Sequence, residues 1–252
     1  MSYGLRMYAK DASMVLSDLT YQPVYIGDAT LISSTNNIGN YGSGNWPRLT
    51  KVNTYRITSV SRPVVFVAAF GGYFHLAGIN PSGNNTWNIT IFFDSSVNPR
   101  ILCFSKMVQP STDTTGMRIY HPDGSVVFDS GLKHLLIDRA VTVPAMSCER
   151  STYKSGNIYY AVWPIGNSSA TFDPLNSPAI CASSEAIALT GQQIQNYTYA
   201  LGFAMQGFYI SNTSVTAAWC SIHNSSGSPT IPEGYHGNSP KMVALINASR
   251  YT

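Results

Sequence analysis

Short runs of β-branched and aromatic residues, separated by Gly, Pro, Asn and Ser, follow one another along almost the whole sequence. Runs of this kind are typical of strands, and the turn residues between them favour antiparallel connections. We predict strands over 3–8, 13–17, 22–27, 53–59, 63–70, 72–78, 86–93, 100–106, 116–121, 125–129, 133–138, 157–163, 199–204, 206–211, 214–222 and 241–248. A short helical turn is favoured over 183–189, where Ser183 or Ser184 could cap it. The spacing predicts an all-β fold of the sandwich or barrel type.

The composition limits the partners that such a fold can have. The chain has 252 residues, of which 44 % are hydrophobic, so it can bury a core as one large β domain or two ordinary ones. Charged residues make up 11 %, against about 25 % in ordinary soluble domains. A neutral, hydrogen-bonding surface suits permanent assemblies or sugars, because amides and hydroxyls are easier to desolvate than charges. The net charge of +3 is scattered, which argues against a nucleic-acid partner.

No stretch of the sequence predicts a membrane span or a cofactor site. The N-terminus lacks the apolar stretch of a signal peptide, and no window approaches the length of an apolar transmembrane segment, so we expect synthesis in the cytosol. Four cysteines, at 103, 148, 181 and 220, have no spacing suited to a metal, and we expect free thiols, mostly buried. We expect no cofactor, metal or catalytic residue.

One thirteen-residue stretch occurs twice. GLRMYAKDASMVL at 4–16 aligns with GMRIYHPDGSVVF at 116–128, an offset of 112 positions. The identical pairs are Gly4/Gly116, Arg6/Arg118, Tyr8/Tyr120, Asp11/Asp123, Ser13/Ser125 and Val15/Val127. This agreement at matched turn positions favours a duplicated β-hairpin.

The turn of the second copy can be predicted from its residues. His121-Pro122-Asp123-Gly124 fits a type I turn followed by a left-handed residue, which Gly124 adopts without strain. Ala12 stands at the matching position of the first copy, where a left-handed backbone would cost about 1–2 kcal/mol. We therefore expect the two copies to differ most in backbone shape at Ala12.

Alternation divides the first strand of the second copy into two faces. It places Met117 and Ile119 on a face that we assign to the core, and Arg118 and Tyr120 on the other. The Arg/Tyr face is either a solvated outer surface or a contact surface for a neighbouring subunit.

The repeat also suggests a division of the chain. We predict two β-sandwich-like modules, 1–110 and 111–252, each opening with the hairpin, elaborated with long polar loops and joined at the linker-like stretch 107–116. The alternative that both hairpins pair within one sheet stays open.

The stretches YGLRMYAKDASMVLSD at 3–18 and TGMRIYHPDGSVVFDSGLKHL at 115–135 resemble the hairpin that opens a group of minor tail and tail-tip proteins of tailed bacteriophages. In that group a Tyr-Gly-apolar-x-apolar strand precedes an Asn/Asp-x-x-Gly turn and a strand ending in Phe-Asp-Ser. The second copy matches through Asp123, Gly124, Phe128, Asp129 and Ser130, whereas the first departs at Ala12, Leu16 and Ser17.

The resemblance implies a structural component of the virion, a minor tail protein of the tail tip or baseplate that contributes to tail assembly and host attachment. It implies assembly in the host bacterial cytoplasm, partners that are copies of itself and other tail or baseplate proteins, and no enzymatic activity.

Two other functions remain as alternatives. Aromatic side chains beside Asn, Ser and Gly in the loops 34–48, 163–178 and 222–240 favour a receptor-binding or carbohydrate-binding module of a tail fibre, contacting a host glycan or receptor. The candidate contact residues are Tyr41, Trp46, Trp163, Phe172, Tyr235 and His236, which could equally anchor the loops on the sandwich. A polysaccharide hydrolase is less favoured, because the few Asp and Glu residues form no recognisable carboxylate pair.

Overall fold

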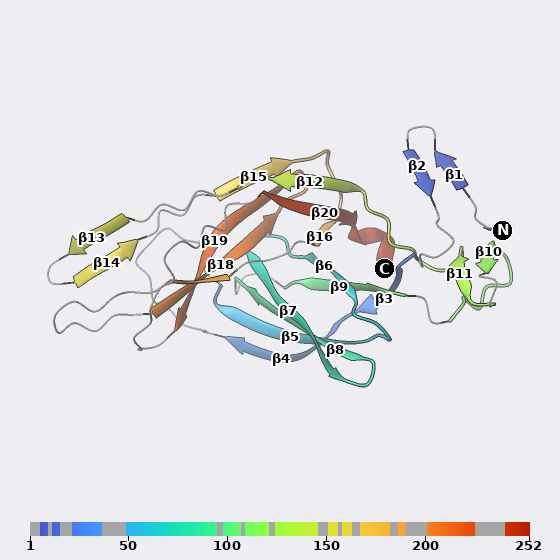
Figure 1. The fold of residues 1–252 in the computed structure, drawn as a ribbon, viewed down its shortest axis with the longest axis horizontal. Helices are drawn as coiled ribbons and strands as arrows, with labels where there is room; N and C mark the ends of the chain where they lie inside the picture. Colours follow the sequence, from blue (N-terminus) through green and yellow to red (C-terminus); the bar gives the residue numbers. More distant parts are fainter. Residues whose placement is uncertain are drawn as a thin grey trace.

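The computed structural model describes an almost entirely β protein (Figure 1). It describes residues 6–9, 12–15, 22–36, 49–94, 98–106, 109–120, 124–145, 151–155, 158–162, 167–181, 186–189, 201–224 and 240–252. Within these ranges the only helical element is a short 3₁₀ turn, η1 (Ala248–Tyr251), and no helix is long and apolar enough to cross a membrane. The predicted all-β class is confirmed.

Two large antiparallel sheets pack together as a sandwich. The six-stranded sheet has the order β12 (Arg139–Val143), β20 (Lys241–Asn247), β16 (Pro178–Cys181), β6 (Val64–Ala68), β9 (Arg100–Ser105) and β3 (Val24–Asp28). The eight-stranded sheet has the order β15 (Asn167–Thr171), β19 (Ser214–Asn224), β18 (Leu201–Ile210), β7 (Phe74–Gly83), β8 (Thr86–Phe93), β5 (Lys51–Thr58) and β4 (Thr30–Asn36), with β17 (Ala186–Leu189) also paired to β18.

Three hairpins form separate two-stranded sheets: β1 (Arg6–Ala9) with β2 (Ala12–Val15), β10 (Arg118–Tyr120) with β11 (Val126–Asp129), and β13 (Ser151–Ser155) with β14 (Ile158–Val162). The two copies of the repeated hairpin are β1–β2 and β10–β11. They do not share a sheet, so the alternative of a common sheet is not what the structure has.

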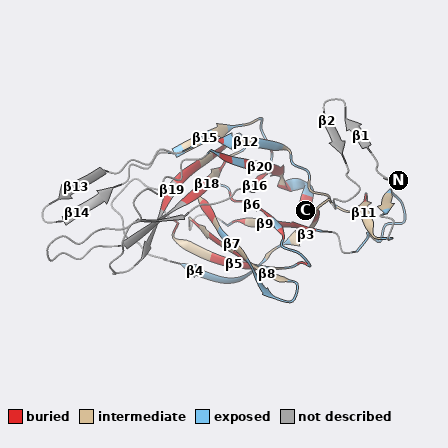
Figure 2. Ribbon diagram, in the orientation of Figure 1, coloured by how far each residue is buried: buried red, intermediate tan, exposed pale blue. Residues whose placement is uncertain are grey.

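Alternating apolar residues build the core between the two sheets. In β8, Ile89, Ile91 and Phe93 are fully buried and face the opposite sheet, which contributes Val67 and Leu245 among others. Alternate side chains of a strand point to opposite faces, so one face of β8 is committed to this core. Figure 2 shows the buried residues gathered on the central strands of both sheets.

Both sheets combine strands from either side of residue 110. The six-stranded sheet joins β16 to β6, and the eight-stranded sheet joins β18 to β7 through the pair Phe208 and Phe74. One buried cluster includes Val67 from the first part and Leu245 from the second. The prediction of two separate modules, 1–110 and 111–252, is therefore wrong for the sandwich, because neither part closes a core by itself.

A second apolar cluster covers the outer face of the six-stranded sheet. Tyr251 of η1 packs on Phe104, with ring centroids 4.8 Å apart, in a cluster that also holds Phe66 and Leu102. Arg100 fixes this turn, since its guanidinium forms an ion pair of 2.6 Å with Asp28 and donates to the backbone oxygens of Ala248 and Tyr251. The end of the described chain is thereby part of the packed structure.

Several local predictions need correction. The helical turn predicted over 183–189 is not formed at Ala186–Leu189, which is strand β17 paired to β18. The strand predicted over 133–138 is reduced to a bridge between His134 and Val24, and the strand itself begins at Arg139. The polar strands β4 and β15 overlap stretches that we predicted as loops. The prediction failed there because the residues of these strands lack apolar alternation.

We predict a single unfolding transition for the sandwich. Ile91→Ala and Leu245→Ala, on opposite sides of residue 110, should each lower the free energy of unfolding by about 2–5 kcal/mol and shift the same transition, because both side chains lie in one core. Urea unfolding followed by circular dichroism and by fluorescence measures this.

Met242→Ala is the matched control, since Met242 lies on the same strand as Leu245 but is 75 % exposed. It should change the free energy of unfolding by less than about 0.5 kcal/mol. Two transitions, each sensitive to one of the core substitutions, would contradict a shared core.

Candidate functional site

The β10–β11 hairpin carries the densest polar network that is described. Arg118 lies opposite Asp129, Ile119 opposite Phe128 and Tyr120 opposite Val126, with an irregularity that leaves Val127 as the extra residue. Gly124 has φ of 85°, which confirms the predicted left-handed glycine. The hairpin is therefore formed with the glycine conformation that its sequence predicts, whereas the type I turn predicted over residues 121–123 lies outside the described residues.

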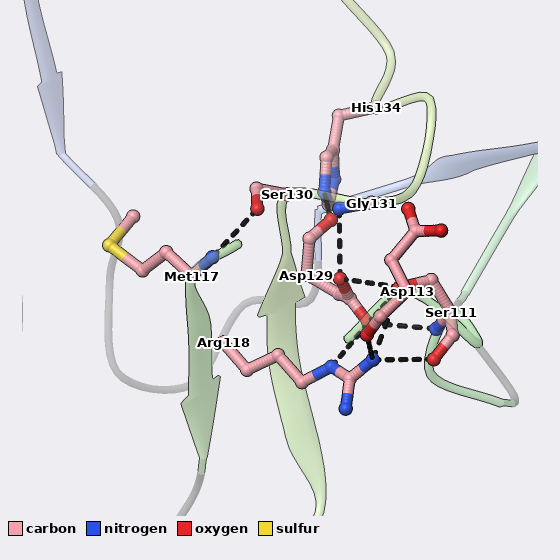
Figure 3. A network of polar contacts seen from close by, with 8 residues as sticks. All are labelled: Ser111, Asp113, Met117, Arg118, Asp129, Ser130, Gly131 and His134. Atoms are coloured by element: carbon pink, nitrogen blue, oxygen red, sulfur yellow. Dashed lines mark hydrogen bonds and ion pairs between the residues drawn. The ribbon is translucent and has the colours of Figure 1, made fainter. Parts of the chain in front are cut away.

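The carboxylate of Asp129 is the centre of this network (Figure 3). The residue is 2 % exposed. It accepts hydrogen bonds from the backbone N–H of Ser111 at 2.8 Å, from the N–H of Gly131 at 2.9 Å and from the hydroxyl of Ser111 at 3.0 Å. Arg118 Nε completes the set with an ion pair of 2.8 Å. Both carboxylate oxygens are thus occupied by donors from three separate segments.

Arg118 extends the network to the segment that precedes the hairpin. Its Nη2 donates to the carbonyl oxygens of Ser111 and Asp113, the latter at 2.9 Å. The hydrogen bond to Asp129 raises the pKa of Arg118 above its ordinary value. The predicted linker 107–116 is therefore not free at Ser111, because Arg118 and Asp129 together fasten its backbone to the hairpin.

The neighbouring residues complete the turn after β11. Ser130 Oγ accepts from the backbone N–H of Met117 at 2.8 Å. A Cβ on Gly116, which has φ of 138°, would lie 2.5 Å from Ser130 Oγ, so a side chain cannot be accommodated there without movement. His134 donates from Nε2 to the carbonyl of Asp129 at 2.7 Å and stacks on Phe128, with ring centroids 4.5 Å apart.

The acid–base state of Asp129 follows from this surrounding. Burial alone would raise the pKa of the carboxyl group, but the donors of Gly131, Ser111 and Arg118 outweigh it and hold the pKa at about 2. The carboxylate stays ionised at neutral pH with its acceptor positions filled. Ser111 donates to the carboxylate, and His134 to a backbone carbonyl, so no nucleophile and base are paired here. The arrangement is suited to holding backbone segments in place.

The first copy of the hairpin closes differently. Ala9 pairs with Ala12, Tyr8 with Ser13 and Arg6 with Val15, so the strand pairing continues closer to the turn than in the second copy, by one residue on the first strand and two on the second. Ala12 is a strand residue, which confirms the predicted difference at the position aligned with Gly124. As a result, Arg6 lies opposite Val15, whereas Arg118 lies opposite an aspartate.

The structure brings together some of the predicted residues and leaves others outside the described ranges. Gly116, Arg118, Tyr120 and Gly124 belong to the hairpin, and the backbones of Arg6 and Tyr8 belong to β1. Gly4, Asp11 and Asp123 lie outside the described residues. Met117 is 42 % exposed, and neither it nor Ile119 joins a buried cluster of the sandwich, so assigning this face to the core was wrong.

Of the six candidate contact residues in the loops, Phe172 lies within the described residues. Its ring packs against the main core, and its N–H donates to the carbonyl of Thr213 at 2.9 Å, so here the aromatic residue anchors its loop. Five further candidates, Tyr41, Trp46, Trp163, Tyr235 and His236, lie outside the described residues.

The cysteines behave as the sequence suggests where they are described. Cys103 and Cys220 are buried free thiols, and Cys181 is free and half-buried. Burial raises the pKa of Cys103 to about 12, so this thiol stays protonated. Cys148 lies outside the described residues. Among the described residues no group of three or more His, Cys, Asp and Glu side chains could hold a metal ion.

No family model, curated protein or solved structure matches this chain. The interpretation of the site therefore depends on the contacts of its own residues. Ser111, Asp113 and His134 were missed by the sequence prediction, because their contacts with Arg118 and Asp129 depend on how the preceding and following segments fold back. The one local signal is the Asp-Ser pair at the end of the second strand, Asp129 and Ser130.

We predict that the hairpin loosens at acid pH. Because the pKa of Asp129 is held at about 2, below its usual 3.8, the carboxylate stabilises the folded hairpin above pH 4. That stabilisation is lost as the pH falls from 3.8 towards 2. Amide hydrogen-exchange protection at Ser111 and Gly131 should fall over this range and should already be low at neutral pH in Asp129→Asn.

Asp173→Asn serves as the control, because the Asp173 side chain is 84 % exposed. It should leave the pH profile of both amides unchanged. Equal protection of Ser111 and Gly131 in the wild type and in Asp129→Asn would contradict the role of this carboxylate.

A second prediction concerns the turn. Gly124→Ala should lower the stability of the hairpin by about 1–2 kcal/mol, because an L residue is strained in the left-handed region that Gly124 occupies at φ of 85°. Gly124→Asn should cost less, since Asn tolerates this region better than Ala. Hydrogen exchange of the β10–β11 amides compares the two variants, and equal effects of Ala and Asn would contradict backbone strain as the cause.

Proposed function

We propose that this chain is a structural component of a bacteriophage virion, a minor tail protein of the tail tip or baseplate that contributes to tail assembly and host attachment. The observation that carries the proposal is the structure of the β10–β11 hairpin. Of the residues through which its sequence resembles tail-tip proteins, the four that are described, Gly124, Phe128, Asp129 and Ser130, all build the hairpin or its attachment. Asp129 anchors three segments, Ser130 closes the turn, and Phe128 stacks on His134.

The position of the hairpin supports a contact role. It forms a two-stranded sheet of its own, outside both sheets of the sandwich, and Figure 1 draws it beyond β3 at one end of the molecule. Tyr120 is 57 % exposed. Tyr is enriched where proteins meet, which favours the Tyr120 side as a contact surface for a neighbouring subunit.

The chemistry of the exterior supports membership of an assembly. Large apolar side chains remain exposed at several places on the sandwich, including Leu31, Ile137 and Met242. Charged residues are scarce, at 11 % of the chain. A surface of this kind is costly to keep in water yet easily desolvated against a partner. Copies of this chain and other tail proteins are the proposed partners, and the proposed location is the tail tip of the virion.

The proposal predicts that virions of the encoding phage contain this chain at the tail tip. Mass spectrometry of purified particles and immunogold electron microscopy test this. Asp129→Ala, which removes the anchor of the hairpin, should reduce the yield of tailed particles, whereas Asp173→Ala, at an exposed carboxylate, should not. Purified virions in which other tail proteins are detected but this chain is not would contradict the proposal.

A further inference from the structure

The two sheet orders end at four strands, and in the part of the chain that the structure describes, three of these end strands are covered or face another one. The backbone of residues 133–135 runs along β3, with Tyr25 N–H donating to Lys133 at 2.7 Å and Leu135 N–H donating to Pro23 at 2.8 Å. At the other side, β12 of one sheet lies against β15 of the other (Figure 1). An ion pair of 3.3 Å between Arg139 and Asp173 links these two edge regions.

Strand β4 is the fourth edge, and among the described residues no strand other than β5 pairs with it. All seven of its residues, Thr30–Asn36, are exposed, as the pale blue β4 in Figure 2 shows. Leu31 is 49 % exposed and Ile32 is 42 % exposed. Since successive side chains point to opposite faces of the sheet, both faces of β4 are exposed, and the six-stranded sheet covers neither.

The sequence of β4, TLISSTN, lacks the charged residues and the proline that commonly protect an edge. Natural edge strands carry Lys, Pro or inward-pointing charges that prevent pairing with another chain. This strand has neither charge nor proline, and its one irregularity is a bulge at Ile32, which leaves Ser33–Asn36 in regular register with β5. Its outward N–H and C=O groups are those that a further extended strand would satisfy.

We propose that β4 pairs with β4 of a second copy of this chain, antiparallel about a two-fold axis. A neutral strand can lie against itself in any register without placing like charges opposite one another, whereas a charged strand cannot. Pairing joins the two eight-stranded sheets into one continuous sheet. It also shields Leu31 and Ile32 in part from water, which adds an apolar contribution to the backbone hydrogen bonds.

The nearest cations do not oppose this pairing. Lys51 and Arg56 lie on β5, opposite Asn36 and Thr30. Three strand spacings, about 14 Å, then separate the β5 strands of the two copies. This distance exceeds the Debye length of about 8 Å at physiological ionic strength, so repulsion between these cations is largely screened.

The pairing deepens the proposed function, because it names one partner surface for assembly of the tail tip. A single strand pair is narrow compared with the interface of a stable dimer, so we expect a dissociation constant in the micromolar range or weaker. Copies held together in a tail would pair more completely, since their effective concentration is high.

Sedimentation velocity of the purified chain over a range of concentrations tests the inference. The wild type should form a dimer, and Ser34→Lys should weaken its association by about tenfold or more, because it places like charges near each other across the two-fold axis. Raising the salt concentration should restore part of the loss. Dimerisation should also slow amide exchange within Ser33–Asn36.

Met242→Lys is the matched control, since it adds the same charge at a site that is 75 % exposed on the other sheet. It should leave dimerisation unchanged, and both variants should melt at the same temperature as dilute wild type. A wild type that stays monomeric at all concentrations, or a dimer weakened by Met242→Lys but not by Ser34→Lys, overturns the inference. A dimer that is absent from virions instead refutes the tail function alone.

Discussion

Burial of one apolar layer between the two sheets is the constraint on which the rest of the structure depends. That layer takes Val67 and Ile91 from the first part of the chain and Phe208 and Leu245 from the second, so neither part has a core of its own. Two of the described segments outside the layer are attached to the sheets that enclose it. The turn η1 packs on the outer face of the six-stranded sheet. The segment after the β10–β11 hairpin joins the edge of the same sheet, where His134 forms a bridge with Val24 of β3.

Charge in this protein serves mainly to fasten irregular segments to that framework. Asp28 with Arg100 holds η1, and Asp138 reinforces it by pairing with Arg250 at 2.7 Å and accepting from the backbone N–H of Asn247. Asp129 with Arg118 holds the hairpin. Arginine suits this use because its planar guanidinium can bind a carboxylate and several carbonyl oxygens at once. Charged residues are few, at 11 % of the chain, which suits a protein that we propose to lie within an assembly.

Apolar alternation predicted strands that bury one face in the core. The range 86–93 coincides with β8, where Ile89, Ile91 and Phe93 alternate with polar residues. The strands β4 and β15 were missed because they lie at sheet edges, where no apolar alternation is required. Likewise, Asp129 and Ser130 could be recognised from the motif, but Ser111, the partner of Asp129, lies in a stretch whose composition resembles a linker.

By itself, the sequence determined the all-β class, the scarcity of charged residues, the repeated hairpin and the backbone difference between Gly124 and Ala12. These properties depend on local propensity, alternation and turn strain, which act between residues that are near in the chain. Only the tertiary structure decided that one sandwich uses both halves of the chain, that Ser111 reaches Asp129, and that β4 is left as an uncovered edge. Each of these depends on which distant segments pack together. The apolar surface that is buried, and with it the stability of the fold, is set by the arrangement of all strands together and cannot be read from any one strand.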